Sequence, residues 1–166
     1  MNHVSHGIDW AKQHCGVRKA DIATTRRLMP DLNALLDTFP EDHEDFAWDV
    51  KVHLLMPRQY PCIPNWHMDN VPRLNGVQQF DKVQPGAPMY LWLSGAPLTQ
   101  FSGGYVEAGK WHLFTQNDSH RGSPAAEHGW RGFIRATHKD ILAPQSGDDR
   151  LRRHTQVYLD AATYEW

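Results

Sequence analysis

Two side chains able to bind a metal ion lie close together in the segment CIPNWHMDNVPR, residues 62–73. His67 and Asp69 are two residues apart, and in an extended chain such residues project to the same face. An imidazole nitrogen and a carboxylate oxygen are both ligands of transition metal ions. Two ligands do not make a site, so this pair requires a third ligand from elsewhere in the chain.

Candidates for the third ligand lie downstream, in FTQNDSHRGSPAAEHGWRGFIRATH, residues 114–138. His120 precedes an Arg-Gly pair and a turn, which predicts a place at a strand end; His112 and His128 are alternatives. Two histidines and one carboxylate on one face of an octahedron leave three positions open. Non-haem Fe(II) oxygenases use this arrangement to bind a bidentate co-substrate and O₂ together. A zinc hydrolase needs only one open position for water, so the triad alone leaves that class open.

A predicted strand, GWRGFIRATH at residues 129–138, adds a feature suited to an anion. Arg131, Phe133 and Arg135 share one face of this strand, and Thr137 continues it. A buried arginine requires an anionic partner. A dicarboxylate that chelates the metal at one end would offer its other carboxylate to a guanidinium fork with a neighbouring hydroxyl.

Together these motifs resemble the 2-oxoglutarate- and Fe(II)-dependent dioxygenases. NWHMD resembles the Trp-His-x-Asp of the taurine-dioxygenase and phytanoyl-CoA-hydroxylase branches. HRG followed by GWRGFIRAT resembles their distal histidine and their oxoglutarate-binding strand. The resemblance covers residues 46–138, and the metal-ligand spacing is shorter than in those two branches, closer to that of compact members.

The resemblance implies a fold and a reaction. The fold is a double-stranded β-helix, a cupin-like jelly roll. The reaction couples decarboxylation of 2-oxoglutarate to oxidation of a substrate C–H bond, with hydroxylation as the usual outcome. The Fe(II) ligands would be His67, Asp69 and His120.

The resemblance also implies residues for the co-substrate. Both strand arginines lie at a distance from His120 that the family uses for its oxoglutarate-binding arginine. Arg135 is favoured for the far carboxylate, because Arg-Ala-Thr matches the family's Arg-x-Ser/Thr. Arg131, Thr137 or Tyr90 would assist it. For Tyr90, packing in the core is the alternative.

The expected elements begin with helices. Apolar residues make up 40% of the chain, with seven Trp and six Phe, which is enough for a packed core. Leu32, Leu35, Leu36 and Phe39 follow a helical spacing that Pro40 ends. A shorter helix is expected at residues 8–14.

From residue 46 onward the pattern is of short strands. Twelve Gly and eleven Pro favour many turns, and no long helix separates the apolar runs. Strands are expected at residues 46–57, 88–95, 110–116, 129–138 and 154–161. We expect one domain over residues 1–166, in which residues 1–45 form a helical support and residues 46–160 form an antiparallel sandwich or jelly roll.

Composition argues against several partners. A formal net charge of −2 gives no electrostatic case for binding nucleic acid or an anionic membrane. No stretch approaches the roughly 18–20 apolar residues of a membrane span, and the N-terminus lacks the pattern of a signal peptide. Cys15 and Cys62 do not form a disulfide framework. These observations predict a cytoplasmic protein.

Two other classes of function stay open. A cupin-like metal-dependent lyase, isomerase or hydrolase would keep the triad but would have no need of Arg135 beside the metal. A non-catalytic β-sandwich binding module would expose His67 and His120 and bind no metal tightly. For an oxygenase, the expected substrate is a small molecule, or an exposed protein side chain or nucleobase.

Overall fold

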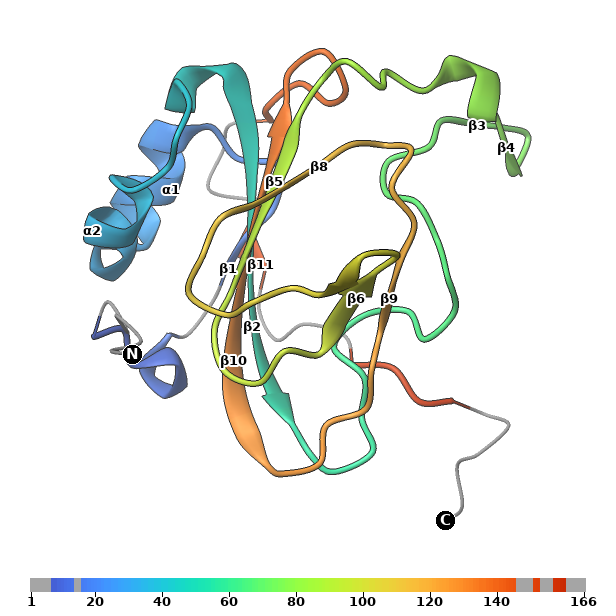
Figure 1. Cartoon of the computed structure of the whole chain (residues 1–166). Helices are drawn as coiled ribbons and strands as arrows, with labels where there is room; N and C mark the ends of the chain where they lie inside the picture. Colours follow the sequence, from blue (N-terminus) through green and yellow to red (C-terminus); the bar gives the residue numbers. More distant parts are fainter. Residues whose placement is uncertain (1–6, 14–15, 146–150, 153–156, 161–166) are drawn as a thin grey trace.

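The computed structural model describes residues 7–13, 16–145, 151–152 and 157–160 of the chain. The larger of its two main sheets is antiparallel, with the strand order β2-β10-β5-β8. Its two long strands, β2 and β10, lie side by side near the centre of Figure 1. The four strands are β2 (Phe46–Leu55), β10 (Gly129–His138), β5 (Met89–Leu93) and β8 (His112–Phe114).

The second main sheet has the order β7-β6-β9 and is also antiparallel. Its strands are β9 (His120–Gly122), β6 (Thr99–Phe101) and β7 (Gly104–Tyr105). An isolated bridge between His67 and His120 adds the metal-ligand segment to the free side of β9. Two short ladders complete the β structure: β1 (Gly16–Val17) with β11 (Leu151–Arg152), and β3 (Arg73–Leu74) with β4 (Val77–Gln78).

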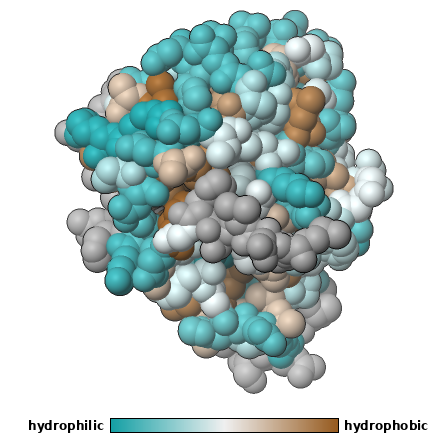
Figure 2. All heavy atoms as spheres, turned by 60° about the vertical axis from the view of Figure 1, so that its left-hand side comes forward, coloured by the Kyte–Doolittle hydropathy of each residue, from teal (hydrophilic) through white to brown (hydrophobic). Residues whose placement is uncertain are grey.

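Helical structure is concentrated before residue 46, on one side of the molecule (Figure 1). The helical spacing expected from Leu32 to Phe39 forms a 3₁₀ turn that begins at Pro30, followed by a short α-helix that ends at Leu36. The elements are η1 (Trp10–Lys12), α1 (Ile22–Leu28), η2 (Pro30–Leu32), α2 (Asn33–Leu36) and η3 (His43–Asp45); η4 (Phe80–Lys82) lies later. Hydrophilic residues cover much of the outer surface on this side, with hydrophobic atoms between them (Figure 2).

The two faces of the larger sheet bury different cores. One face packs against the N-terminal helices and carries Trp48, Val50, Trp92 and Ile134. Gly132 lies on this face as well, and the position requires glycine because a Cβ there would lie 2.3 Å from the ring of Trp10. The other face meets the second sheet through an apolar cluster made of Met89, Leu91, Leu93, Phe101, Val106 and Phe114.

The prediction of a mainly β protein with N-terminal helices is confirmed. The first four predicted strands correspond to β2, β5, β8 and β10. Of the predicted strand at 154–161, residues 154–156 and 161 lie outside the described residues, and Tyr158 makes a bridge to Tyr60. The expected helix at 8–14 is a single 3₁₀ turn, with residue 14 outside the described part. No helix in the described residues is long and apolar enough to cross a membrane.

Candidate metal centre

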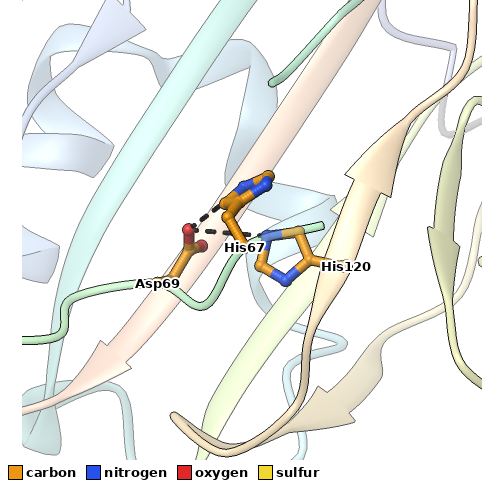
Figure 3. A group of neighbouring side chains, drawn as sticks. All are labelled: His67, Asp69 and His120. Atoms are coloured by element: carbon orange, nitrogen blue, oxygen red, sulfur yellow. Dashed lines mark ion pairs between the residues drawn. The ribbon is translucent and has the colours of Figure 1, made fainter. Parts of the chain in front are cut away.

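Three side chains converge between the two main sheets: His67, Asp69 and His120 (Figure 3). The first two come from the loop that follows β2, and His120 is the first residue of β9. The Oδ1 atom of Asp69 lies 3.8 Å from Nε2 of His67 and 3.4 Å from Nε2 of His120. Because one ligand atom of each residue lies within 4.8 Å of the others, the group can surround one ion.

Backbone pairing explains why the two histidines meet. His67 and His120 exchange both of their N–H···O hydrogen bonds, each 2.9 Å long. Residues paired in this way project to the same face, and the two ring centroids are 4.4 Å apart. In the HRG motif, Gly122 is required by the approach of the same loop, because a Cβ there would lie 2.6 Å from the carbonyl oxygen of Cys62.

The orientation of both rings leaves Nε2 directed at Asp69. Nδ1 of His67 lies 2.8 Å from the carbonyl oxygen of Asn65, and Nδ1 of His120 lies 3.4 Å from that of Asp118. A carbonyl only accepts, so Nδ1 is the protonated nitrogen and Nε2 carries the lone pair that a metal needs. Burial lowers the pKa of His67, which favours the neutral, metal-binding form.

The second carboxylate oxygen of Asp69 is held by an arginine. Nη1 of Arg135 donates to Oδ2 of Asp69 at 2.7 Å, and Nη2 donates to Oδ2 of Asp49 at 3.2 Å. Burial alone would raise the pKa of Asp69, but the charge and the hydrogen bond of Arg135 hold it well below its usual range. Burial likewise opposes the charge on Arg135, yet the two carboxylates raise the pKa of its guanidinium. Arg135 is therefore committed to two carboxylates of the protein itself.

Arg131 has a different environment on the same face of β10. The residue is 3% exposed. Its Nη2 donates to the hydroxyl of Thr99 at 3.1 Å, and its Nε, like that of Arg135, has no hydrogen-bond partner among the described residues. Burial lowers the pKa of Arg131 to about 10, so it is charged at neutral pH. Among the residues that the structure describes, no carboxylate forms an ion pair with it.

A cavity of about 110 Å³ connects these features. The triad lines it together with Arg135, Lys51 and Phe133, and the Nζ of Lys51 lies 4.8 Å from the centre of the Phe133 ring. Thr99 and Cys62 also line it, and Thr99 is the residue that Arg131 contacts. The cavity thus reaches from the metal ligands toward the buried guanidinium.

The other candidate histidines lie outside the group. The ring of His112 packs against Phe101 in a tilted arrangement with centroids 4.7 Å apart, and Phe101 in turn stacks on His120 at 4.8 Å. His128 is exposed in the turn before β10. Among the described residues, His67, Asp69 and His120 are the set that converges on one point.

Two of the residues expected at the co-substrate lie elsewhere. Tyr90 is on the helix-covered face of β5, where its hydroxyl donates to Glu41 at 2.7 Å, which corrects the expected contact with oxoglutarate. Leu91, one residue later, faces the cavity instead. Thr137 lies on the expected face of β10 and is fully buried, but it does not line the cavity.

Sequence reasoning missed Asp49 and Thr99. Asp49 is 1% exposed and lies directly opposite Arg135 in the β2–β10 pairing. A lone carboxylate in the apolar run FAWDV was a signal for a buried partner, since a buried charge requires one. Thr99 gave no such signal, because a threonine in a strand is common.

Comparisons of the chain with protein-family models, with curated proteins and with solved structures found no match. Its function must therefore be inferred from the geometry of the site.

Proposed function

We propose that this chain is an Fe(II)- and 2-oxoglutarate-dependent oxygenase, a hydroxylase in its usual reaction. The observation that carries the proposal is a juxtaposition. A two-histidine, one-carboxylate group lines a cavity together with Thr99, and Thr99 contacts a buried arginine, Arg131, for which the described residues supply no carboxylate. The first feature suits a metal with open positions, and the second suits a dianionic co-substrate.

The pairing of strands supports a double-stranded β-helix as the fold. In the two main sheets the first strand pairs with the last, β2 with β10, and the second segment, at His67, pairs with the next to last, β9. Further inward β5 pairs with β8, and β6 pairs with β7. Nested pairs of this kind form when a two-stranded antiparallel ribbon winds into two facing sheets.

The donor set fits the proposed metal. Two imidazole nitrogens and one carboxylate oxygen on one side leave room for a chelating co-substrate and O₂. When bound, Fe(II) would supply the site at which O₂ is reduced and the substrate C–H bond is oxidised. His67, Asp69 and His120 would hold it, with both histidine rings oriented by backbone carbonyls.

The co-substrate requires a cation beyond the metal, and here we favour Arg131 over Arg135. Arg135 is already paired with Asp49 and Asp69. Arg131 lies four residues earlier on the same face, about 13 Å along the strand. A keto acid that chelates the metal would reach Arg131 past Thr99, which lines the cavity and contacts the guanidinium. Thr99, which contacts Arg131, would supply the hydroxyl assigned from sequence to Thr137.

The rival classes fit less well. A lyase, isomerase or hydrolase on a similar barrel would have no use for a desolvated arginine that contacts Thr99 at the cavity wall. A binding module with incidental histidines would expose them, whereas His120 is 5% exposed. The substrate, a small molecule or an exposed side chain or nucleobase, would enter where His67, Asp69 and Lys51 are half-buried.

An anaerobic titration of 2-oxoglutarate into the Fe(II)-loaded protein tests the proposal. Chelation of Fe(II) by a keto acid gives a visible charge-transfer band, and we expect this band in the wild type. His67→Ala should abolish it, while His112→Ala, which removes a neighbouring ring outside the triad, should retain it. Iron binding without the band would favour the cupin-like alternative, and failure to bind any metal would overturn the enzyme proposal.

A further inference from the structure

Behind the proposed metal ligands lies a row of three buried charges: Asp69, Arg135 and Asp49. The guanidinium of Arg135 lies 2.7 Å from one carboxylate and 3.2 Å from the other. Asp49 is too far along this row to be a ligand, because Arg135 separates it from Asp69. Its burial in a strand therefore needs a reason other than direct metal binding.

The position of Asp49 is fixed from two sides. It faces Arg135 directly across the β2–β10 ladder, and cross-strand neighbours of opposite charge attract each other. Its Oδ1 accepts the backbone N–H of Lys19 at 3.3 Å. Lys19 itself adopts a left-handed φ of 50° beside the bridge that joins Ala20 to Trp48. The N-terminal segment thus holds Asp49, and Asp49 holds Arg135.

Arg135 in turn divides the two oxygens of Asp69 between two tasks. Oδ2 accepts the short hydrogen bond from Nη1, and Oδ1 is the atom that faces both histidine Nε2 atoms. A carboxylate held in this way can give a metal one oxygen only. A carboxylate free to turn can give two oxygens, and the second would occupy one of the open positions.

We propose that Asp49 and Arg135 are positioning residues that keep Asp69 coordinated through one oxygen. This arrangement preserves the open positions on which the proposed function rests. Since the two carboxylates outnumber the guanidinium, the row also carries one negative charge, which favours a divalent cation. Arg135 acts directly on Asp69, and Asp49 acts through Arg135.

The test uses Mn(II) as the probe with the full chain, because it requires neither oxoglutarate nor turnover. Metal affinity is measured by titration, and the relaxation of water protons reports how many waters the bound Mn(II) holds. In the wild type we expect waters at the three positions that a facial triad leaves open. Arg135→Lys keeps the charge but loses the fork, and should weaken Mn(II) binding by about tenfold, the low end for partners that orient a metal ligand. It should also displace one of the three waters.

Asp49→Asn keeps the size of the side chain. It should lower the Mn(II) affinity and the number of bound waters, both by less than Arg135→Lys does. The double variant should match Arg135→Lys, because Asp49 acts through that residue. Arg121→Lys is the matched control, an arginine next to His120 that donates to Gln100 instead, and it should leave both quantities unchanged. Thermal unfolding of each metal-free variant checks that it folds; if Arg135→Lys does not, Asp49→Asn carries the test.

The outcomes separate this inference from the proposed function. If the wild type binds Mn(II) and both variants keep its affinity and water number, the positioning role is overturned while the metal centre stands. Additive losses in the double variant would overturn the path from Asp49 through Arg135. A wild type that binds no metal would remove the centre and this inference together.

Discussion

The two faces of the β2-β10-β5-β8 sheet come from the same strands but differ in what they bury. The helix-covered face carries Trp48, Val50 and Ile134 and is almost wholly apolar. The cavity face of the same strands carries Asp49, Arg131 and Arg135. Alternation of side chains along a strand lets one element serve both faces. Stability is expected to depend mainly on the helix-covered face, and ligand binding on the cavity face. A substitution on one face should therefore change one property and leave the other.

The largest effect on stability is expected from Trp48→Ala on the helix-covered face. Trp48 is fully buried, and its ring contacts Phe39 at a centroid distance of 4.9 Å. Its loss should reduce the free energy of unfolding by about 3–5 kcal/mol, the usual cost of such a cavity. Urea denaturation measures this cost. The protein that remains folded should bind one metal ion as before; a loss of metal affinity in the folded fraction would show that the two faces are coupled.

Arg131→Met tests the opposite case on the cavity face. A methionine fills similar space without a buried charge, so the free energy of unfolding should rise by about 1 kcal/mol or more. Binding of 2-oxoglutarate to the Fe(II)-loaded protein should weaken by about 10–100-fold, because hydrogen bonds to charged groups contribute roughly 1.5–3 kcal/mol. Arg131→Lys keeps the charge but loses the guanidinium fork, so its affinity for 2-oxoglutarate should lie between those of the wild type and Arg131→Met. Wild-type oxoglutarate affinity in Arg131→Met would return the assignment to Arg135.

Part of the cavity face was predictable from the sequence, because its signals are local. His67 and Asp69 are two residues apart, and Arg131 and Arg135 are four apart on one strand, so alternation alone puts each pair on one face. His120 was expected at a strand end, and it is the first residue of β9, although the Arg-Gly pair after it continues the strand. These predictions needed no knowledge of the other strands.

The rest depended on long-range register. Asp49 and Arg135 are 86 residues apart in the chain, and only the β2–β10 pairing brings them together. The choice between the two arginines also turned on this contact. The sequence left Tyr90 open between the co-substrate and the core, because MYLWL is apolar at every position and alternation gave no sign of which side chains face the cavity. The structure confirms the core alternative.

On the cavity face, the charge of Asp69 should make the free energy of unfolding of the metal-free protein depend on pH. The lowered pKa of Asp69 means that, below the unfolded value of about 3.9, the unfolded chain binds the proton more readily. The contribution of this carboxylate is therefore present above about pH 5 and is lost as pH falls below about 4. Asp69→Asn should flatten the fall in unfolding free energy from pH 6 to pH 3 in urea denaturation. Asp81→Asn, with an exposed side chain, should leave it unchanged; equal slopes in wild type and Asp69→Asn would contradict the pairing with Arg135.

The smallest effect is expected on the outer surface of the second sheet, one residue from a metal ligand. Arg121 follows His120 but projects away from the cavity, where it lies 4.8 Å from the ring of Trp66 and donates to Gln100. Arg121→Ala should cost about 0.5–1 kcal/mol in urea denaturation, as for an exposed cation–π contact. Mn(II) affinity should stay within twofold of wild type, or about 0.4 kcal/mol. A larger loss would mean that closeness to His120 in the sequence, and not the face of the strand, determines how a residue affects metal binding. Arg135 lies fifteen residues after His120 in the sequence. If metal affinity is unchanged in Arg121→Ala but falls tenfold when Arg135 is replaced, the face on which a residue lies decides its effect.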